Sequence, residues 1–203
     1  MTTQEKGISA KQVAELRQRT GAGMMDCKKA LEQTNGDMDA AVELLRKSGA
    51  AKAEKRVGRV ASEGLVGSYI HHNGKVGVIV EVNCETDFVA RTDDFKQLVK
   101  SIAEHIAAAA PIAVDKDQIP AEKIESERRI FSEQVKESGK PAHLVDKIVE
   151  GKVEAFYKEV CLLNQPWVRD DKKTVGELVK ELAGKTGENI QVRRFARFKI
   201  GEA

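Results

Sequence analysis

The chain has 203 residues, of which 41% are hydrophobic, 33% charged and only 4% aromatic, a composition that indicates a helix-rich globular protein and argues against disordered, collagen-like and membrane classes. Lys and Arg total 34 against 32 Asp and Glu, so the net charge of +2 argues against a protein that binds many nucleic-acid phosphates. Since no apolar run approaches ~18 residues and the first residues contain no hydrophobic signal core, we expect a cytoplasmic protein with no membrane contact.

Residues 1–49 are predicted to form a compact unit of three helices. Ser9 and Gln12 have the spacing of a capping box, in which the Ser side chain accepts from a free backbone amide and the Gln side chain reaches back. The glycine-containing stretch 20–23 breaks the first helix, and an Asn-Gly pair at 35–36 turns the chain again. A unit of this size is only marginally stable alone.

The second and third helices of this unit are indicated by apolar spacing and by caps. Met24, Cys27 and Leu31 recur at i, i+3 and i+7, which predicts the inner stripe of the second helix. Asp37 is placed to cap the third helix, and we interpret Gly49 as its end.

A basic linker and a β-hairpin are predicted next. Residues 50–62 alternate Ala with Lys and Arg, and we expect a linker that is helical in part. From residue 63 to 85 the apolar residues recur with a period of two, and Asn73-Gly74 lies between the two runs, which is a strong hairpin signal. A two-residue turn at this pair sets the register. The predicted cross-strand pairs are His71 with Val76, Tyr69 with Val78, Gly67 with Val80 and Leu65 with Val82.

One face of this hairpin is strongly apolar, and we expect the helices that follow to cover it. Interruptions of the helical pattern are expected at Gly139 and Gly151, and a capping box at Thr174 and Glu177 begins a later helix. The stripes predicted to cover the sheet are Phe95, Leu98, Val99, Ile102 and Ile106 in the first helix, and Ile124, Phe131 and Val135 in the next.

A last strand is predicted where Ile190, Val192, Phe198 and Ile200 alternate with polar residues. This strand can join the hairpin in an antiparallel sheet of about three strands. We therefore predict an α+β fold, in which residues 63–203 form the core domain after the small helical unit.

The tripeptide Gly184-Lys185-Thr186 ends like a phosphate-binding loop. The full motif needs a second Gly five positions before Gly184, where the chain has Val179, and the tripeptide follows a helix instead of beginning one after a strand. We interpret Gly184 as a helix stop.

The histidines and cysteines lack the spacing of a metal site, a disulfide framework or a nucleophile motif. We expect surface or strand-end histidines, three free thiols in a reducing compartment, no metal, no cofactor and no catalytic residue. The residues concerned are His71, His72, His105, His143, Cys27, Cys84 and Cys161.

The last strand is also basic and has two aromatic residues among its cations, a combination that supports single-stranded nucleic-acid binding on some sheets. Alternation offers another explanation, in which one face packs and the other is solvated by charge. We favour the solvated face and expect no direct nucleic-acid binding. The residues are Arg193, Arg194, Phe195, Arg197, Phe198 and Lys199.

The segment Thr86-Asp87-Phe88-Val89, just after the hairpin, allows two interpretations. In the first, Thr86 or Asp87 caps a turn while Phe88 and Val89 enter the core. In the second, Phe88 is presented on a loop beside a carboxylate, as a short probe for a partner's pocket. Physical reasoning alone leaves both open.

Two longer segments resemble a known family. Residues 81–91, EVNCETDFVAR, closely resemble the second signature of the elongation factor Ts family, the guanine-nucleotide exchange factors of the GTPase elongation factor Tu. Residues 16–31, LRQRTGAGMMDCKKAL, resemble its N-terminal signature, and the order of helical unit, linker, hairpin and TDFV is also similar. The resemblance covers residues 8 to about 201.

The resemblance implies a ubiquitin-associated-like N-terminal domain, an α+β core, and a translation factor that binds elongation factor Tu without chemistry of its own. It also implies roles for two sets of residues. Thr86, Asp87, Phe88 and Val89 would disturb the partner's magnesium site, with Phe88 as a wedge near the nucleotide, while Met24 and Met25 at an exposed turn would dock on the GTPase domain.

The sequence departs from the longer members of this family, which carry two related core halves, a protruding helical hairpin and a C-terminal helical extension. This sequence has one β-hairpin and stops at Ala203. We expect the contacts of those extra parts to be absent, or to come from a second copy of the chain in a homodimer.

Overall fold

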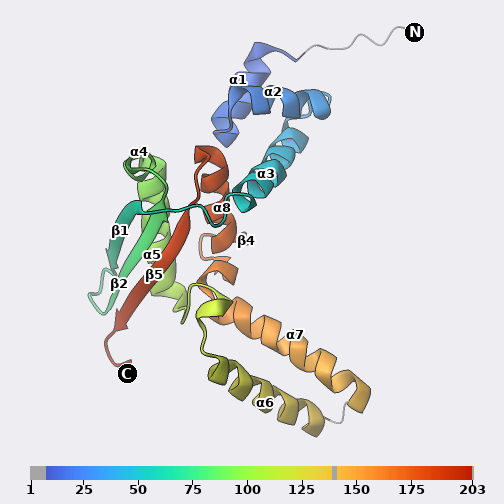
Figure 1. The fold of residues 1–203 in the computed structure, drawn as a ribbon, viewed down its shortest axis with the longest axis vertical. Helices are drawn as coiled ribbons and strands as arrows, with labels where there is room; N and C mark the ends of the chain where they lie inside the picture. The colour runs from blue at the N-terminus through green and yellow to red at the C-terminus, as the bar shows by residue number, and fades with distance from the viewer. Residues whose placement is uncertain (1–7, 139–140, 203) are drawn as a thin grey trace.

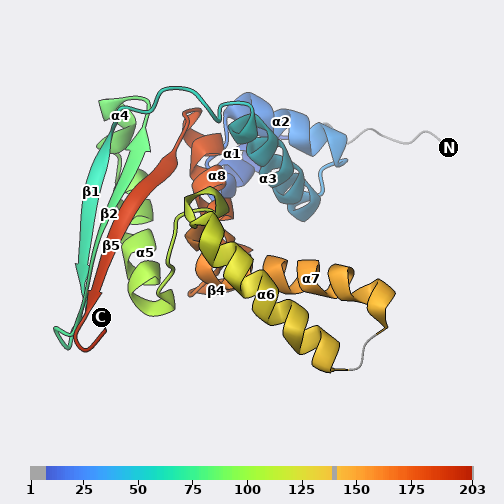
Figure 2. The ribbon, with the colours of Figure 1, turned by 60° about the horizontal axis from the view of Figure 1, so that its bottom comes forward.

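The computed structural model describes residues 8–138 and 141–202 (Figure 1). Residues 1–7 of the predicted helical unit, Gly139 of the predicted helix break and Ala203 of the predicted core lie outside them. The chain forms a bundle of three helices, a three-stranded antiparallel sheet with helices on one face, and a projecting pair of helices (Figures 1 and 2). The predicted α+β fold is confirmed.

The N-terminal bundle consists of α1 (Ala10–Thr20), α2 (Met24–Gln33) and α3 (Met38–Glu54). The predicted caps are confirmed, because Ser9 and Gln12 form the reciprocal capping box and the Asp37 carboxylate accepts from two amides at 3.0 Å each. The buried residues of the bundle form a small core separate from that of the sheet. They are Val13, Leu16, Cys27, Ala30, Leu31 and Ala41.

The predictions that Gly49 and Gly184 end helices are wrong. α3 continues through Gly49 to Glu54, and α8 (Val175–Thr186) continues through Gly184 and ends at Gly187, whose φ is 80°. A Cβ atom at position 184 would lie 3.1 Å from the backbone of Gly49, so the two glycines meet where α3 crosses α8. Gly184 permits the close approach of the two helices, whereas a Cβ atom at position 49 would have no neighbour within 4 Å, and neither glycine acts as a stop.

The sheet has the order β1 (Glu63–Ile70), β2 (Val76–Cys84), β5 (Gln191–Lys199). Every predicted cross-strand pair of the hairpin is confirmed. The turn differs in detail, because the amide of Gly74 donates to the carbonyl of His71 at 2.7 Å. His72 and Asn73 therefore occupy the centre of the turn, and Gly74 follows with a φ of 67°.

A β-bulge alters the pattern of the last strand, because Arg193 is an extra residue in β5 relative to β2. The bulge reverses the alternation of side chains, so Val192 and Phe195 both turn towards the core. Phe198 and Ile200 are 69% and 74% exposed, and the prediction that they share a face with Val192 is wrong.

The main core lies between one face of the sheet and the helices α5 (Asp93–Ala109) and α8 (Figure 2). Val78, Val80 and Val82 of β2 are buried there against α5, which confirms the predicted cover by the first helical stripe. These three valines and the first residue of the stripe, Phe95, are at most 1% exposed. Their burial contributes to the hydrophobic stabilisation of the main core.

The second predicted stripe, Ile124, Phe131 and Val135, packs against another helix instead of the sheet. α6 (Ala121–Glu137) and α7 (Ala142–Val160) pack against each other around Val135, Val145, Val149 and Val153, and they project from the core (Figure 1). The predicted cover of the sheet by this stripe is wrong, because an apolar stripe shows that a helix needs a partner without identifying it. The predicted break at Gly151 and the expected lack of a protruding helical hairpin are wrong as well.

Backbone hydrogen bonds close the base of this helical hairpin. The amide of Ile112 donates to the carbonyl of Val160 at 2.9 Å, and the amide of Leu162 donates to the carbonyl of Ala113 at 2.9 Å. Two short 3-10 helices, η1 (Lys116–Gln118) and η2 (Leu162–Asn164), flank the base. The chain thus leaves and re-enters the core at neighbouring points.

His105 of α5 is fully buried, which corrects the expectation of a surface histidine. Its Nε2 lies 2.9 Å from Oε1 of Gln165, and its Nδ1 accepts from the amide of Val168 at 3.3 Å. Burial lowers its pKa, against a smaller opposing effect of Gln165, so the ring is neutral at pH 7. The histidine thus ties α5 to the short β3–β4 hairpin (Pro166–Trp167 and Asp170–Thr174).

Within residues 8–138 and 141–202, no helix is both long enough and apolar enough to cross a membrane.

Candidate functional site

The segment between β2 and α5 forms a single exposed turn, α4 (Asp87–Ala90). Thr86 caps this turn, because its Oγ1 accepts from the amide of Val89 at 3.4 Å. Phe88 points outwards and is 79% exposed, whereas Val89 packs against the core. The sequence left two interpretations open, and the structure combines them. Thr86 caps a turn and Val89 packs inwards, as in the first interpretation, but Phe88 is presented at the surface, as in the second.

Asp87 provides a carboxylate directly beside Phe88. It forms an ion pair with Arg91, one helical turn later, at 2.8 Å. The Arg91 side chain is 77% and the Asp87 side chain 44% exposed, so this pair orients the carboxylate more than it stabilises the fold. The turn therefore presents an aromatic ring and a carboxylate side by side at the surface.

Glu188, in the turn between α8 and β5, anchors this helical turn. Its Oε2 accepts from the amides of Glu85 and Thr86 at 3.1 Å each, and its Oε1 accepts from the hydroxyl of Thr86 at 2.6 Å. Sequence reasoning missed Glu188, because the bonds join residues 102 and 103 positions apart and no local pattern marks them.

The anchoring is reciprocal. The amide of Asn189 donates to Oε1 of Glu85 at 2.6 Å, and the Asn189 side chain donates to the carbonyl of Arg59 at 2.8 Å. Arg59 in turn pairs with Glu85 at 3.6 Å. The turn before β5 and the turn after β2 therefore hold each other in place.

Met24 and Met25 begin α2 and are 56% and 63% exposed. Cys27 and Leu31 are buried as predicted, but the exposure of Met24 excludes it from the inner stripe, where Ala30 lies instead. Flexible methionine side chains suit an adaptable docking surface. The bundle and α4 lie towards the same end of the molecule, away from the β1–β2 turn (Figures 1 and 2).

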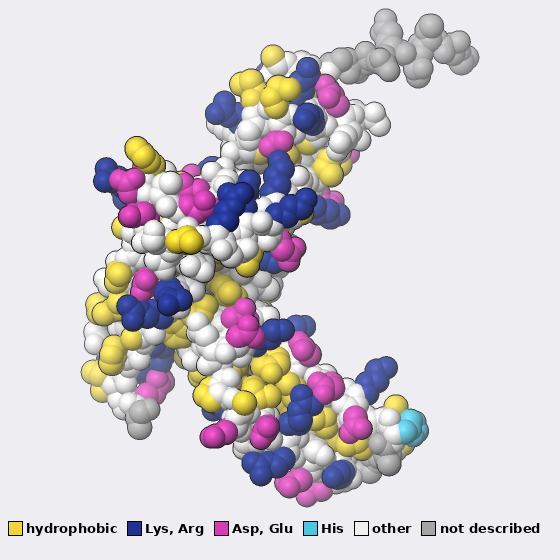
Figure 3. All heavy atoms as spheres, in the orientation of Figure 1, with side chains coloured by type: hydrophobic (Ala, Val, Ile, Leu, Met, Phe, Trp, Pro, Cys, Tyr) yellow, Lys and Arg dark blue, Asp and Glu magenta, His cyan; other side chains and the backbone are white. Residues whose placement is uncertain are grey.

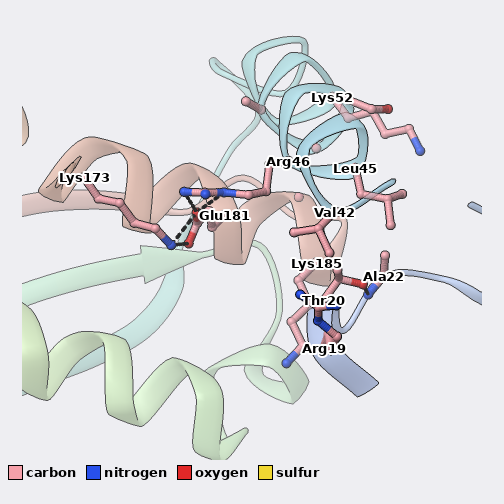
Figure 4. Close-up of a pocket in the computed structure, with 14 residues that line it drawn as sticks. Arg19, Thr20, Ala22, Val42, Leu45, Arg46, Lys52, Lys173, Glu181 and Lys185 are labelled. Carbon is pink, nitrogen blue, oxygen red and sulfur yellow. Dashed lines mark hydrogen bonds and ion pairs between the residues drawn. The ribbon is translucent and has the colours of Figure 1, made fainter. Parts of the chain in front are cut away.

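A groove of about 280 Å³ runs between the bundle and α8 (Figure 4). Arg46 and Lys173 converge on Glu181 at 3.0 and 2.9 Å, and Lys185 pairs with Asp94 at 2.7 Å. Since these side chains pair with one another, and Arg46 of α3 reaches Glu181 of α8, we interpret the groove as part of the contact that places the bundle on the core.

Cys84 lies next to the site but is not a nucleophile. Burial, with a smaller effect from the charge of Glu188, raises the pKa of its thiol to about 11, and the thiol donates to the carbonyl of Thr86 at 3.2 Å. Cys27 and Cys161 are also buried and free, as predicted. In the described part of the chain, no group of three or more His, Cys, Asp or Glu side chains is arranged to hold a metal ion.

The cations of β5 are largely paired within the protein. Arg194 forms an ion pair with Glu81 at 2.7 Å, and Arg197 and Lys199 both pair with Glu202. Arg197 is also turned towards α5, where it donates to a backbone carbonyl. This arrangement differs from an open row of cations that tracks a phosphate backbone.

Comparisons with known proteins agree with the signatures in the sequence. The sequence model of the family described as Elongation factor TS matches residues 9–202, a span that includes α2, α4 and Glu188. Elongation factor Ts of Fervidobacterium nodosum is 57% identical over 195 residues, which cover 96% of this chain and 99% of that protein. Elongation factor Ts of Geobacter sulfurreducens is 56% identical, with 96% and 90% covered, and that of Thermosipho melanesiensis is 54% identical, with 96% and 100% covered. The chain belongs to the elongation factor Ts family.

Proposed function

We propose that this protein is a guanine-nucleotide exchange factor, which binds elongation factor Tu with GDP and promotes release of the nucleotide so that GTP can enter. The observation that carries the proposal is Phe88, an aromatic side chain 79% exposed on a turn that Glu188 anchors. Membership of the elongation factor Ts family supports the choice of partner.

Two contact regions act in this proposal. Thr86, Asp87, Phe88 and Val89 meet the partner near its magnesium site, where Phe88 wedges between side chains beside the nucleotide. Met24 and Met25 dock on the GTPase domain. Loss of a divalent cation next to the phosphates weakens nucleotide binding, because the ion is the largest local charge there.

Linkage explains why no covalent chemistry is needed. A factor that binds nucleotide-free elongation factor Tu more tightly than the GDP form must weaken GDP binding by the same ratio. The protein is then an exchange factor that works in the cytoplasm without a cofactor and is not an enzyme. Direct nucleic-acid binding has no role in the proposal, which the paired cations of β5 support.

The test is a release assay with elongation factor Tu that carries fluorescent GDP. Substoichiometric amounts of the protein are expected to speed release in the presence of excess GTP, since each molecule acts repeatedly. A release rate equal to the spontaneous rate at all concentrations of the protein would refute the proposal.

We propose in addition that two copies of the chain associate through the outer face of the sheet. No described helix covers this face (Figure 2), and hydrophobic side chains gather along the sheet in Figure 3. Exposed Val66, Ile70, Ile79 and Phe198 lie on it, and the same patch on a second copy can pair with it around a two-fold axis.

Replacement of Ile79, the central residue of this patch, by Lys is expected to convert the dimer to a monomer with little change in folding. Light scattering coupled to size-exclusion chromatography measures the mass of both forms. A monomeric parent protein would contradict the dimer, and a dimeric Ile79→Lys variant would contradict its location.

A further inference from the structure

The turn that presents Phe88 is too short to fix its own direction. α4 has four residues, and a single helical turn gains little from its own hydrogen bonds. Its orientation must therefore come from contacts at its ends. At the C-terminal end Val89 packs against the core, and at the N-terminal end Thr86 provides the cap.

The cap depends on Glu188. The Thr86 hydroxyl donates its single proton to Glu188 Oε1 at 2.6 Å, which leaves a lone pair of Oγ1 for the Val89 amide. Glu188 Oε2 also accepts from the amides of Glu85 and Thr86, so it fixes both the backbone and the side chain of the capping residue.

The site requires a carboxylate because all three groups that face it are donors. An ionised Glu offers two acceptor oxygens, whereas Gln offers one oxygen and an amino group that would face a donor. Charge-assisted bonds of this kind are also stronger than neutral ones. Glu188→Gln therefore preserves the size of the side chain but removes the acceptor for at least one of these three hydrogen bonds.

We infer that Glu188 is a positioning residue for nucleotide release: acting through Thr86, it holds α4 so that Phe88 meets elongation factor Tu in the orientation that dislodges the nucleotide. This inference rests on the proposed role of Phe88. It predicts that Glu188 matters for the rate of release more than for the affinity of the two proteins, because the second contact region, Met24 and Met25, remains intact.

The experiment is a double-mutant cycle of Phe88→Ala and Glu188→Gln, with Glu177→Gln as the matched control. Glu177 also accepts from the backbone, in the capping box at the start of α8, but it lies outside the anchor of α4. For each variant, the maximal rate of GDP release at saturating protein, the dissociation constant for elongation factor Tu and the melting temperature are measured.

Glu188→Gln is expected to lower the maximal release rate about tenfold, with a change in affinity below about threefold, as for an interaction used mainly in the transition state. Glu177→Gln is expected to leave the maximal release rate unchanged. The double variant is expected to be no slower than the slower single variant, because both changes remove the same function.

The outcomes distinguish the inference from the function on which it rests. Full release by Phe88→Ala would refute the proposed probe itself. Slow release by Phe88→Ala with full release by Glu188→Gln, or additive losses in the double variant, would refute the positioning role alone. If Glu188→Gln does not fold, Thr86→Val replaces it in the experiment. Thr86→Val keeps the shape of the side chain but removes the hydroxyl that links Glu188 to Val89. Full release by Thr86→Val with slow release by Phe88→Ala would then refute the positioning role.

Discussion

Phe88→Ala is expected to slow GDP release from elongation factor Tu about tenfold or more, while the melting temperature stays within about 2 °C of the parent value. The side chain is exposed in the free protein, so its truncation removes little packing. Affinity for the partner is expected to fall less than the release rate, because Met24 and Met25 of the bundle still provide contacts. Thermal unfolding, partner affinity and GDP release are measured on the same sample.

Phe95→Ala is the matched control for this change. Phe95 lies seven positions later and is fully buried in the main core, so its truncation is expected to cost ~3–5 kcal/mol of unfolding free energy. The same Phe→Ala change is thus expected to lower the unfolding free energy strongly at the buried position 95 and little at the exposed position 88. A large loss of stability in Phe88→Ala, or full release by a well-folded Phe88→Ala protein, would contradict the role of this residue.

Gly184→Leu is expected to destabilise the protein by ~1–3 kcal/mol, the usual range for an overpacked contact, and to loosen the bundle from the core. Even a Cβ atom at this position would press on the backbone of Gly49 at 3.1 Å, and the rest of a Leu side chain needs still more room. A loosened bundle no longer holds Met24 and Met25 at a fixed position relative to Phe88, so the dissociation constant for elongation factor Tu is expected to rise about tenfold.

Gly49→Leu is the control, because a Cβ atom at position 49 has no neighbour within 4 Å. Both variants gain similar intrinsic helix propensity, ~0.8 kcal/mol, so the difference between them reports the crossing alone. Small-angle scattering and protease sensitivity of residues 55–62 are expected to change in Gly184→Leu only. Equal behaviour of the two variants would show that the crossing of α3 and α8 does not set the position of the bundle.

The predictions from sequence succeeded where the signal is local. The Asn-Gly pair and a period of two determined the register of β1 and β2, and each capping box lies where its three-residue spacing placed it. These features depend on residues a few positions apart, so a single sequence contains the whole of the information.

Failures occurred where the partner of a residue is distant in the chain. Gly49 and Gly184 look like helix stops, and only the contact of position 184 with the backbone of Gly49 shows that Gly184 is a packing residue. The extra residue Arg193 in β5 is defined only against β2, and it turns Phe198 outwards. In each case a correct local rule was overruled by a tertiary contact.

The candidate site shows the same division. The cap at Thr86 was among the local expectations, but the exposure of Phe88 was not determined by its sequence neighbours. The resemblance to the elongation factor Ts family drew attention to residues 86–89, and it gave no indication of Glu188. That residue became visible only when the turn before β5 was found beside the turn after β2.

The closed base of the α6–α7 hairpin makes this part of the chain a modular insertion. Ala113 and Cys161 form a β-bridge between neighbouring backbone segments. The two ends of the inserted segment therefore meet the core at the same positions, whatever the length of the chain between them. Because loop-closure entropy grows only slowly with length, the helices can be lengthened or shortened during evolution at little expense to the core. The length of the α6–α7 hairpin can therefore vary while the geometry of α4 and its anchor stays constant.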